Sequence, residues 1–202
     1  MFYYQTDFDL SPNAKNWVLE HFKHKWKFNF YHDADWTLNS GWQNSPIEQE
    51  LSDFLLPFGL DLKYAGINCF ISNLSKFEIT NPHVDILHRN KQLLPIKSRF
   101  NLMILGNSED PMCWWNTLKY GDSKLEKKLF TYGSTFYESL AVPGDSIEER
   151  WQHLGTPTEI KTNLLAPSSF VNTNYAHALK LSAGPRLILS VPFDRYLDEY
   201  VN

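Results

Sequence analysis

The stretch SSFVNTNYAHALKLSAGPRLILSVPF, residues 168–193, holds two runs of strand-forming residues on either side of a short turn sequence. The runs at 168–181 and 185–193 are rich in aliphatic and aromatic side chains, which favour strands when turn residues bound them. The sequence SAGP at 182–185 predicts a hairpin loop between them. This part of the chain therefore predicts an antiparallel β-structure.

The predicted hairpin also fixes which side chains share a face. In its register His177 lies near Ser190, and Leu181 lies opposite Arg186. Because side chains alternate along a strand, His177, Arg186, Ile188 and Ser190 then face the same side. A slip of one residue would separate them. We therefore expect a histidine and a cation to project into one space.

Other runs of strand-forming residues, also bounded by turn residues, begin at about residue 63. Because no long helix separates them, they indicate a closed or sandwiched antiparallel sheet. Residues 145–154, DSIEERWQHL, predict a short surface helix. The further runs that predict strands are YAGINCFIS (64–72), SRFNLMIL (98–105), MCWWN (112–116) and LFTYGSTFYES (129–139).

The first sixty residues carry helix signals instead. Ser11-Pro12 and Ser45-Pro46 each combine a capping residue with proline at the first helical position. The aromatic segment WKFNFYHDADWTL (26–38) between them predicts a strand or irregular structure. We expect a single domain, 1–202, in which a mainly helical layer (1–62) packs on the outer sheet of a β-core (63–202).

Composition narrows the class of protein. The net charge is −4 and lysine and arginine form no run longer than a pair, which argues against a protein that grips long nucleic acid through phosphates. Cys69 and Cys113 are too few for a disulfide framework. The segment MFYYQTDFDL lacks a secretory signal, and no stretch approaches the roughly 20 apolar residues of a membrane span. We expect a cytoplasmic protein without membrane partners.

The sequence NPHVDI (81–86) places a histidine and a carboxylate two residues apart. On a strand, residues two apart face the same side, so His83 and Asp85 can offer a nitrogen and an oxygen to one metal ion. Such a pair arises often by chance, and a loop histidine next to a capping aspartate is the alternative. The later histidine, His177, is the residue that strengthens the metal interpretation.

Together these residues resemble the signature of the Fe(II)/2-oxoglutarate-dependent oxygenases: His-X-Asp, a distant histidine, and an arginine about ten places beyond it. The resemblance implies a double-stranded β-helix (jelly-roll, cupin-like) barrel. It implies that His83, Asp85 and His177 bind Fe(II), and that Arg186 pairs with the distal carboxylate of the co-substrate 2-oxoglutarate. Arginine suits that task because its planar fork matches a carboxylate.

Within that superfamily the chain looks closest to the aspartyl/asparaginyl β-hydroxylase and prolyl 4-hydroxylase branches. Arg99, Asn101 and Met103 share one strand face, and the β-hydroxylases carry Arg-X-His in the comparable strand, where it helps to bind the co-substrate. Asn101 stands where that histidine would be. The other positions that carry the likeness are Trp115, Asn116 and Asn172.

One departure concerns the arginine motif. Many of these oxygenases have Arg-X-Ser, whereas here Ile188 follows Arg186 at the third position. Ser190, two residues further on the same face, can replace the missing hydroxyl. Arg99, Asn101, Ser190 and Arg186 are therefore the expected co-substrate residues. Two alternatives stay open: Arg99 and Asn101 contact the carboxylate or amide of the substrate instead, or Arg99 forms a salt bridge with an acidic residue.

The resemblance implies hydroxylation of an amino-acid side chain in a peptide or protein, or of a free amino acid, with dioxygen as oxidant. Trp36 and Trp42 are candidates to line the mouth of the barrel. Two alternatives stay open at this point. One is a cupin-like metal-binding barrel that does not use 2-oxoglutarate, and the other is a non-catalytic barrel that binds a peptide.

Overall fold

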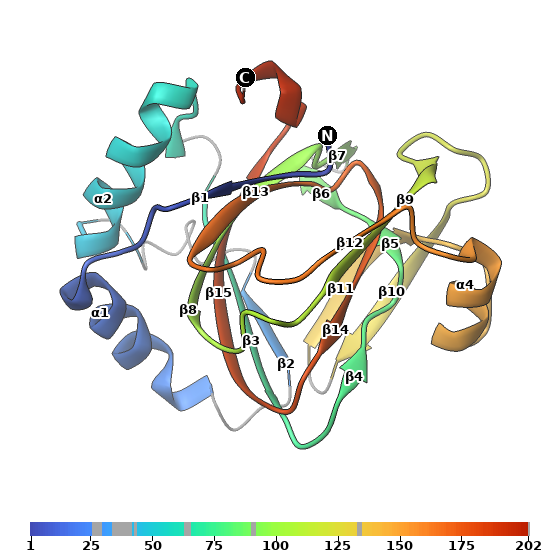
Figure 1. The fold of residues 1–202 in the computed structure, drawn as a ribbon, viewed down its shortest axis with the longest axis horizontal. Helices are drawn as coiled ribbons and strands as arrows, with labels where there is room; N and C mark the ends of the chain where they lie inside the picture. Colours follow the sequence, from blue (N-terminus) through green and yellow to red (C-terminus); the bar gives the residue numbers. More distant parts are fainter. Residues whose placement is uncertain are drawn as a thin grey trace.

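The computed structural model shows a mainly β protein whose two large sheets carry short helices on their outer sides (Figure 1). The helices are α1 (Pro12–Phe22), α2 (Pro46–Leu55) and α4 (Ile147–Leu154), with 3-10 turns at Lys23–Lys25, Leu56–Phe58 and Leu197–Glu199. The structure describes residues 1–25, 30–33, 42, 44–62, 66–89, 92–132 and 135–201.

The strands form two antiparallel sheets and one small two-stranded ribbon. The six-stranded sheet has the order β1-β13-β8-β15-β3-β2, and the seven-stranded sheet has the order β10-β11-β5-β14-β9-β12, with β4 beside β14. The ribbon is β6-β7. The bounds are β1 Tyr3–Thr6, β2 Phe30–Asp33, β3 Asn68–Leu74, β4 Glu78–Ile79, β5 His83–Val84, β6 Ile86–Arg89, β7 Gln92–Pro95, β8 Ser98–Leu105, β9 Met112–Lys119, β10 Glu126–Tyr132, β11 Thr135–Ala141, β12 Glu159–Lys161, β13 Ser168–Asn172, β14 Tyr175–Leu181 and β15 Gly184–Phe193.

The predicted β14–β15 hairpin is wrong, although both strands exist. β15 pairs with β3 and β8, and β14 pairs with β4, β5 and β9 in the other sheet. Leu181 consequently lies opposite Glu78, and Arg186 lies opposite Ser72. The chain crosses between the sheets at the SAGP segment.

The residues on the outer faces of β14 and β15 explain why these two strands lie in different sheets. The outward residues Leu187, Leu189 and Val191 of β15 are buried in the core beneath α1 and α2. The outward residues of β14 are the small Ala176 and Ala178, which belong to a separate buried cluster against which α4 packs. Because β15 buries its outer face against α1 and α2, and β14 buries its outer face in the cluster beneath α4, the two strands belong to different sheets.

The helical layer packs on the six-stranded sheet as expected. Ser11 caps α1 by accepting a hydrogen bond from the Ala14 N–H (3.3 Å), and both its N–H and its hydroxyl donate to Glu50 of α2 (2.8 and 2.6 Å). α2 begins at Pro46, but Ser45 makes no capping bond. β2 lies within the segment 26–38, which predicted a strand or irregular structure, whereas β1 was not predicted.

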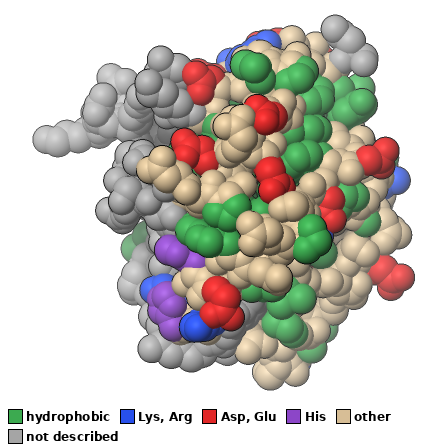
Figure 2. All heavy atoms as spheres, turned by 90° about the vertical axis from the view of Figure 1, so that its left-hand side faces the viewer, with side chains coloured by type: hydrophobic (Ala, Val, Ile, Leu, Met, Phe, Trp, Pro, Cys, Tyr) green, Lys and Arg blue, Asp and Glu red, His purple; other side chains and the backbone are tan. Residues whose placement is uncertain are grey.

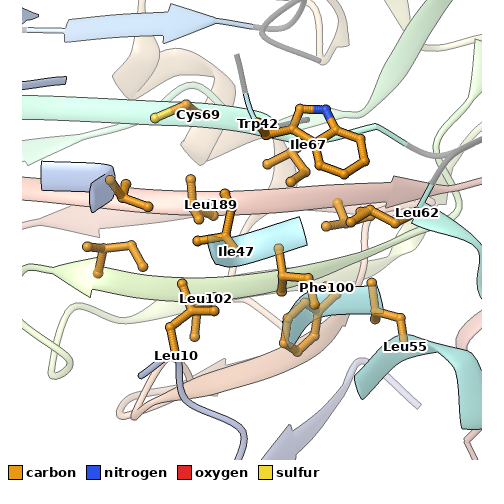
Figure 3. Close-up of a cluster of buried hydrophobic side chains, with 14 of the residues drawn as sticks. Leu10, Trp42, Ile47, Leu55, Leu62, Ile67, Cys69, Phe100, Leu102 and Leu189 are labelled. Carbon is orange, nitrogen blue, oxygen red and sulfur yellow. The ribbon is translucent and has the colours of Figure 1, made fainter. Parts of the chain in front are cut away.

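The largest hydrophobic core lies between these helices and the sheet (Figure 3). Phe100 on β8 contacts Phe54 of α2 and Phe170 of β13, each with ring centroids 5.0 Å apart. Trp42 is also in this core and is 5% exposed, so its predicted place at the mouth of the barrel is wrong. Trp36 lies outside the described residues.

Figure 2 shows the outer face on the helical side. Acidic side chains are scattered over it, and histidine side chains lie at its lower left together with some of the lysine and arginine side chains. Among the described helices, none is long and apolar enough to cross a membrane.

Replacing Phe100 with alanine tests the aromatic contact between helix and sheet. Phe100 is fully buried, so Phe100→Ala should lower the free energy of unfolding by about 3–5 kcal/mol in urea denaturation. Phe77 is 60% exposed, and Phe77→Ala should change it by less than about 0.5 kcal/mol. Equal effects of the two variants would contradict this placement of the core.

Candidate metal centre

Two histidines that are distant in sequence face each other on adjacent strands. His83 on β5 and His177 on β14 are partners in the antiparallel pair. Asp85 follows β5; its N–H donates to the Thr173 carbonyl and its carbonyl accepts from the Ile96 N–H, both at 3.3 Å. These backbone bonds continue the line of β5, so the Asp85 side chain lies on the same side as that of His83.

The three side chains converge on one point. One possible ligand atom from each of His83, Asp85 and His177 lies within 4.8 Å of the others. The Asp85 Oδ1 is 3.2 Å from the His83 Nε2 and 3.7 Å from the His177 Nε2. Two imidazole nitrogens and one carboxylate oxygen at this spacing form a ligand set that could hold a divalent metal ion.

Hydrogen bonds on the far side of each imidazole orient the rings. The His83 Nδ1 bonds to the Asn81 carbonyl (2.7 Å), and the His177 Nδ1 bonds to the Tyr175 carbonyl (2.9 Å). A carbonyl only accepts, so each Nδ1 carries the proton. The Nε2 of each ring is then the nitrogen that faces Asp85 and that can bind a metal ion. This outer hydrogen bond is the device that fixes the tautomer of metal-binding histidines.

The charge states of the cluster also suit a cation. Burial, and after it the His83 imidazole, lowers the pKa of His177 to about 4, so this ring is neutral at pH 7. Burial acts to raise the pKa of Asp85, but the Arg99 guanidinium and, after it, a hydrogen bond with His83 outweigh burial and hold that pKa well below its ordinary value. An ionised carboxylate thus lies beside the neutral imidazole of His177, and a cation bound between the two would be stabilised.

Side chains of helix α4 donate hydrogen bonds to the residues just before β5. The Arg150 guanidinium is buried and donates to the Asn81 side chain, and the Trp151 Nε1 donates to the Thr80 carbonyl (3.1 Å). Because the Asn81 carbonyl bonds to the His83 ring, the hydrogen bonds from α4 help to fix the orientation of His83. Arg150 was not predicted as a site residue.

Three of the predicted co-substrate residues form a polar network beside Asp85. The Arg99 Nε donates to the Asp85 Oδ2, and the Arg99 Nη1 donates to the Asn68 Oδ1 (2.8 Å) and the Ser190 Oγ (3.2 Å). The Ser190 hydroxyl donates to the Asn101 Oδ1 (2.6 Å). Arg99, Asn101 and Ser190 therefore share the inner face of their sheet, as the strand alternation predicted.

Arg186 is placed differently. It lies near the start of β15, four residues before Ser190, and its Nη1 donates to the Asp110 Oδ2 (3.2 Å). Asp110 also accepts from the N–H of Ser182 (3.0 Å) and from its hydroxyl. Among the described residues, nothing accepts from the Nε and Nη2 of Arg186. Within the described part of the chain, the Arg186 guanidinium therefore contacts a carboxylate along one edge only.

Asn68 and Asp110 are site neighbours that sequence reasoning missed. Asn68 begins β3, and Asp110 lies in the loop between β8 and β9. Neither is part of a spacing motif, and both reach their partners only through strand pairing that is distant in sequence. The one local signal is that polar residues stand next to apolar strand runs.

Comparisons with known proteins give no family. No protein-family model matches the chain, and no curated protein matches it. The solved structures include the L-ribose isomerase of Acinetobacter sp. DL28 in complex with L-ribose, at 19% identity and a TM-score of 0.32, covering 64% of this chain and 48% of that chain. This chain thus spans about half the length of that isomerase.

Two further solved structures are similar to this chain at the same low level. The L-ribose isomerase of Geodermatophilus obscurus is 19% identical, with 69% of this chain and 53% of that chain covered and a TM-score of 0.32. HygX from Streptomyces hygroscopicus with iron bound is 9% identical, with 94% and 80% covered and a TM-score of 0.40. Similarity of this size assigns neither family nor activity to the chain.

Loss of one imidazole should abolish tight metal binding. We expect the wild type to bind Co(II) anaerobically in calorimetric titration, and His177→Ala to bind it roughly a hundredfold more weakly or not at all. His153→Ala is the matched control, since His153 lies on α4 outside this cluster and its Nδ1 bonds to the Pro143 carbonyl (2.8 Å). Equal affinities of wild type and His177→Ala would exclude a metal site here.

Proposed function

We propose that this chain is a non-haem Fe(II), 2-oxoglutarate-dependent dioxygenase in which His83, Asp85 and His177 bind the iron. The observation that carries the proposal is the convergence of two oriented imidazoles and one charge-compensated carboxylate. A two-histidine, one-carboxylate set with open positions is the ligand set of non-haem Fe(II) oxygenases.

The strand order supports a double-stranded β-helix for this centre. From β3 onward the six-stranded sheet contains the neighbours β3-β15-β8-β13, and the other sheet contains the neighbours β5-β14-β9-β12. The chain passes from one sheet to the other between β3 and β5, β5 and β8, and β8 and β9, and it does so again between β12 and β13, β13 and β14, and β14 and β15. A two-stranded ribbon coiled into a helix has this order of strands. In that fold the inner faces of both sheets surround the metal.

When bound, Fe(II) with 2-oxoglutarate and dioxygen would supply an oxidant for a C–H bond; 2-oxoglutarate yields succinate and CO₂, and the substrate gains a hydroxyl group. The residues of the chain bind and orient these reactants. The inner polar face, with Asn101 as an amide donor, would orient a carboxylate or amide near the iron.

Arg186 is the residue that we propose for the distal carboxylate of 2-oxoglutarate. It projects from the same face of β15 as Ser190, about 13 Å along the strand at 3.3 Å per residue. A flexible arginine can reach back over part of that separation. The edge of its guanidinium that does not contact Asp110 suits a carboxylate.

The substrate class follows from the resemblance to the β-hydroxylases and prolyl hydroxylases. We propose an amino-acid side chain, in a peptide or protein or in a free amino acid, within a cytoplasmic setting. This part of the proposal rests on the sequence likeness alone.

A second candidate is a cupin-like metalloenzyme that uses the same ligands without 2-oxoglutarate. One observation favours it: Asp110 already neutralises Arg186, and burial, which Asp110 opposes, lowers the pKa of that guanidinium. The distal carboxylate of 2-oxoglutarate would then approach an Arg186 whose charge Asp110 already compensates.

Anaerobic titration separates the two candidates. Addition of 2-oxoglutarate to the Fe(II) protein should produce the weak visible charge-transfer band of a chelated keto acid. Arg186→Ala should weaken 2-oxoglutarate binding roughly tenfold to a hundredfold, because it removes charged hydrogen bonds. Arg195→Ala, at an arginine paired with Glu199 near the C-terminal turn, should leave the affinity unchanged. Bound iron without any band would favour the second candidate.

A further inference from the structure

Arg99 contacts the candidate metal centre through the carboxylate of Asp85. Its Nε donates to Oδ2, whereas the Oδ1 of the same carboxylate faces both histidines, at 3.2 and 3.7 Å. The two oxygens of Asp85 therefore have different partners. One oxygen is held by a guanidinium from the six-stranded sheet, and the other is directed at the imidazoles of the seven-stranded sheet.

The guanidinium itself is fixed by two neighbouring strands. Asn68 on β3 and Ser190 on β15 both accept from the Arg99 Nη1, and Ser190 is in turn bonded to Asn101. The Arg99 residue is 8% exposed, so water competes little for these bonds. An arginine with several hydrogen bonds of this kind presents its Nε in one direction.

We propose that Arg99 is a positioning residue that holds the Oδ2 of Asp85 and so limits this carboxylate to coordinating the metal through Oδ1 alone. A carboxylate can bind a metal through one oxygen or two. Binding through two would occupy one further coordination position. Arg99 thereby keeps that position open for an exchangeable ligand.

This inference rests on the proposed iron centre and changes the expected role of Arg99. With its Nε and Nη1 engaged by Asp85, Asn68 and Ser190, Arg99 acts through a metal ligand instead of anchoring a co-substrate carboxylate. That anchoring role then falls to Arg186.

The test uses Mn(II) as a probe, because it accepts imidazole and carboxylate ligands and reports bound water in its magnetic resonance. Mn(II) is added to the full-length protein in ¹⁷O-enriched water, and bound waters are counted from the hyperfine coupling. Arg99→Gln should hold one water fewer than the wild type and bind Mn(II) roughly tenfold to a hundredfold more weakly. Arg99→Lys, which keeps a charged donor, should restore the wild-type water count.

A second variant guards against misfolding of Arg99→Gln. Asn68→Ala leaves the charge of Arg99 in place but removes one of its supports, so it should shift affinity and water count in the same direction by a smaller amount. Thermal unfolding of each metal-free variant checks that it is folded.

The outcomes separate this inference from the proposed function. An unchanged water count and affinity in folded Arg99→Gln would overturn the positioning role and leave the oxygenase proposal intact. The expected loss of one water, together with no keto-acid band in the wild type, would support the positioning role while the 2-oxoglutarate proposal fails. A wild type that binds no Mn(II), Co(II) or Fe(II) would overturn both.

Discussion

A carboxylate buried between two imidazoles and a guanidinium is the interaction on which the rest of this structure depends. Removing Asp85 from water is unfavourable unless opposite charge or strong hydrogen bonds compensate it. The compensation comes from both sheets: the histidines belong to β5 and β14, and Arg99 belongs to β8. The faces of the two sheets must therefore meet at this point, with polar residues on the inside of both.

That inner polar face explains why the two larger apolar clusters lie on the outer sides of the sheets, whereas a smaller one around Trp114 and Val171 lies between them. The aliphatic residues of β8 and β15 that alternate with the polar network pack against α1 and α2. On the other sheet, Trp115 of β9 packs beneath α4, in ring contact with Trp151 (4.9 Å between centroids). The helices thus stabilise each sheet from its outer side, and the polar site residues occupy the inner faces.

Local patterns in the sequence predicted what depends on alternation and turn chemistry. The strand at 98–105, its polar and apolar faces, and the helix near 147–154 are confirmed. Trp114 and Trp115 do lie in separate clusters, as neighbours on one strand should. The co-substrate roles of Asn101, Ser190 and Arg186 stay predictions, and for Arg99 the proposed positioning role takes the place of the predicted one. What could not be predicted was the pairing of strands. The hairpin assumed for β14 and β15 is absent because the two strands pack against different helices. Asp110, in the loop between β8 and β9, becomes the partner of Arg186 only because β8 and β15 pair in one sheet.

The separation of the ligands along the chain has a consequence for how the protein matures. His83 and Asp85 are synthesised early, but His177 follows almost half the chain later and reaches them only when β14 pairs with β5. Long-range pairing of this kind is slow relative to local structure. The proposed ligand set is therefore complete only after β14 has paired with β5, so the site is assembled later than the local helices and turns.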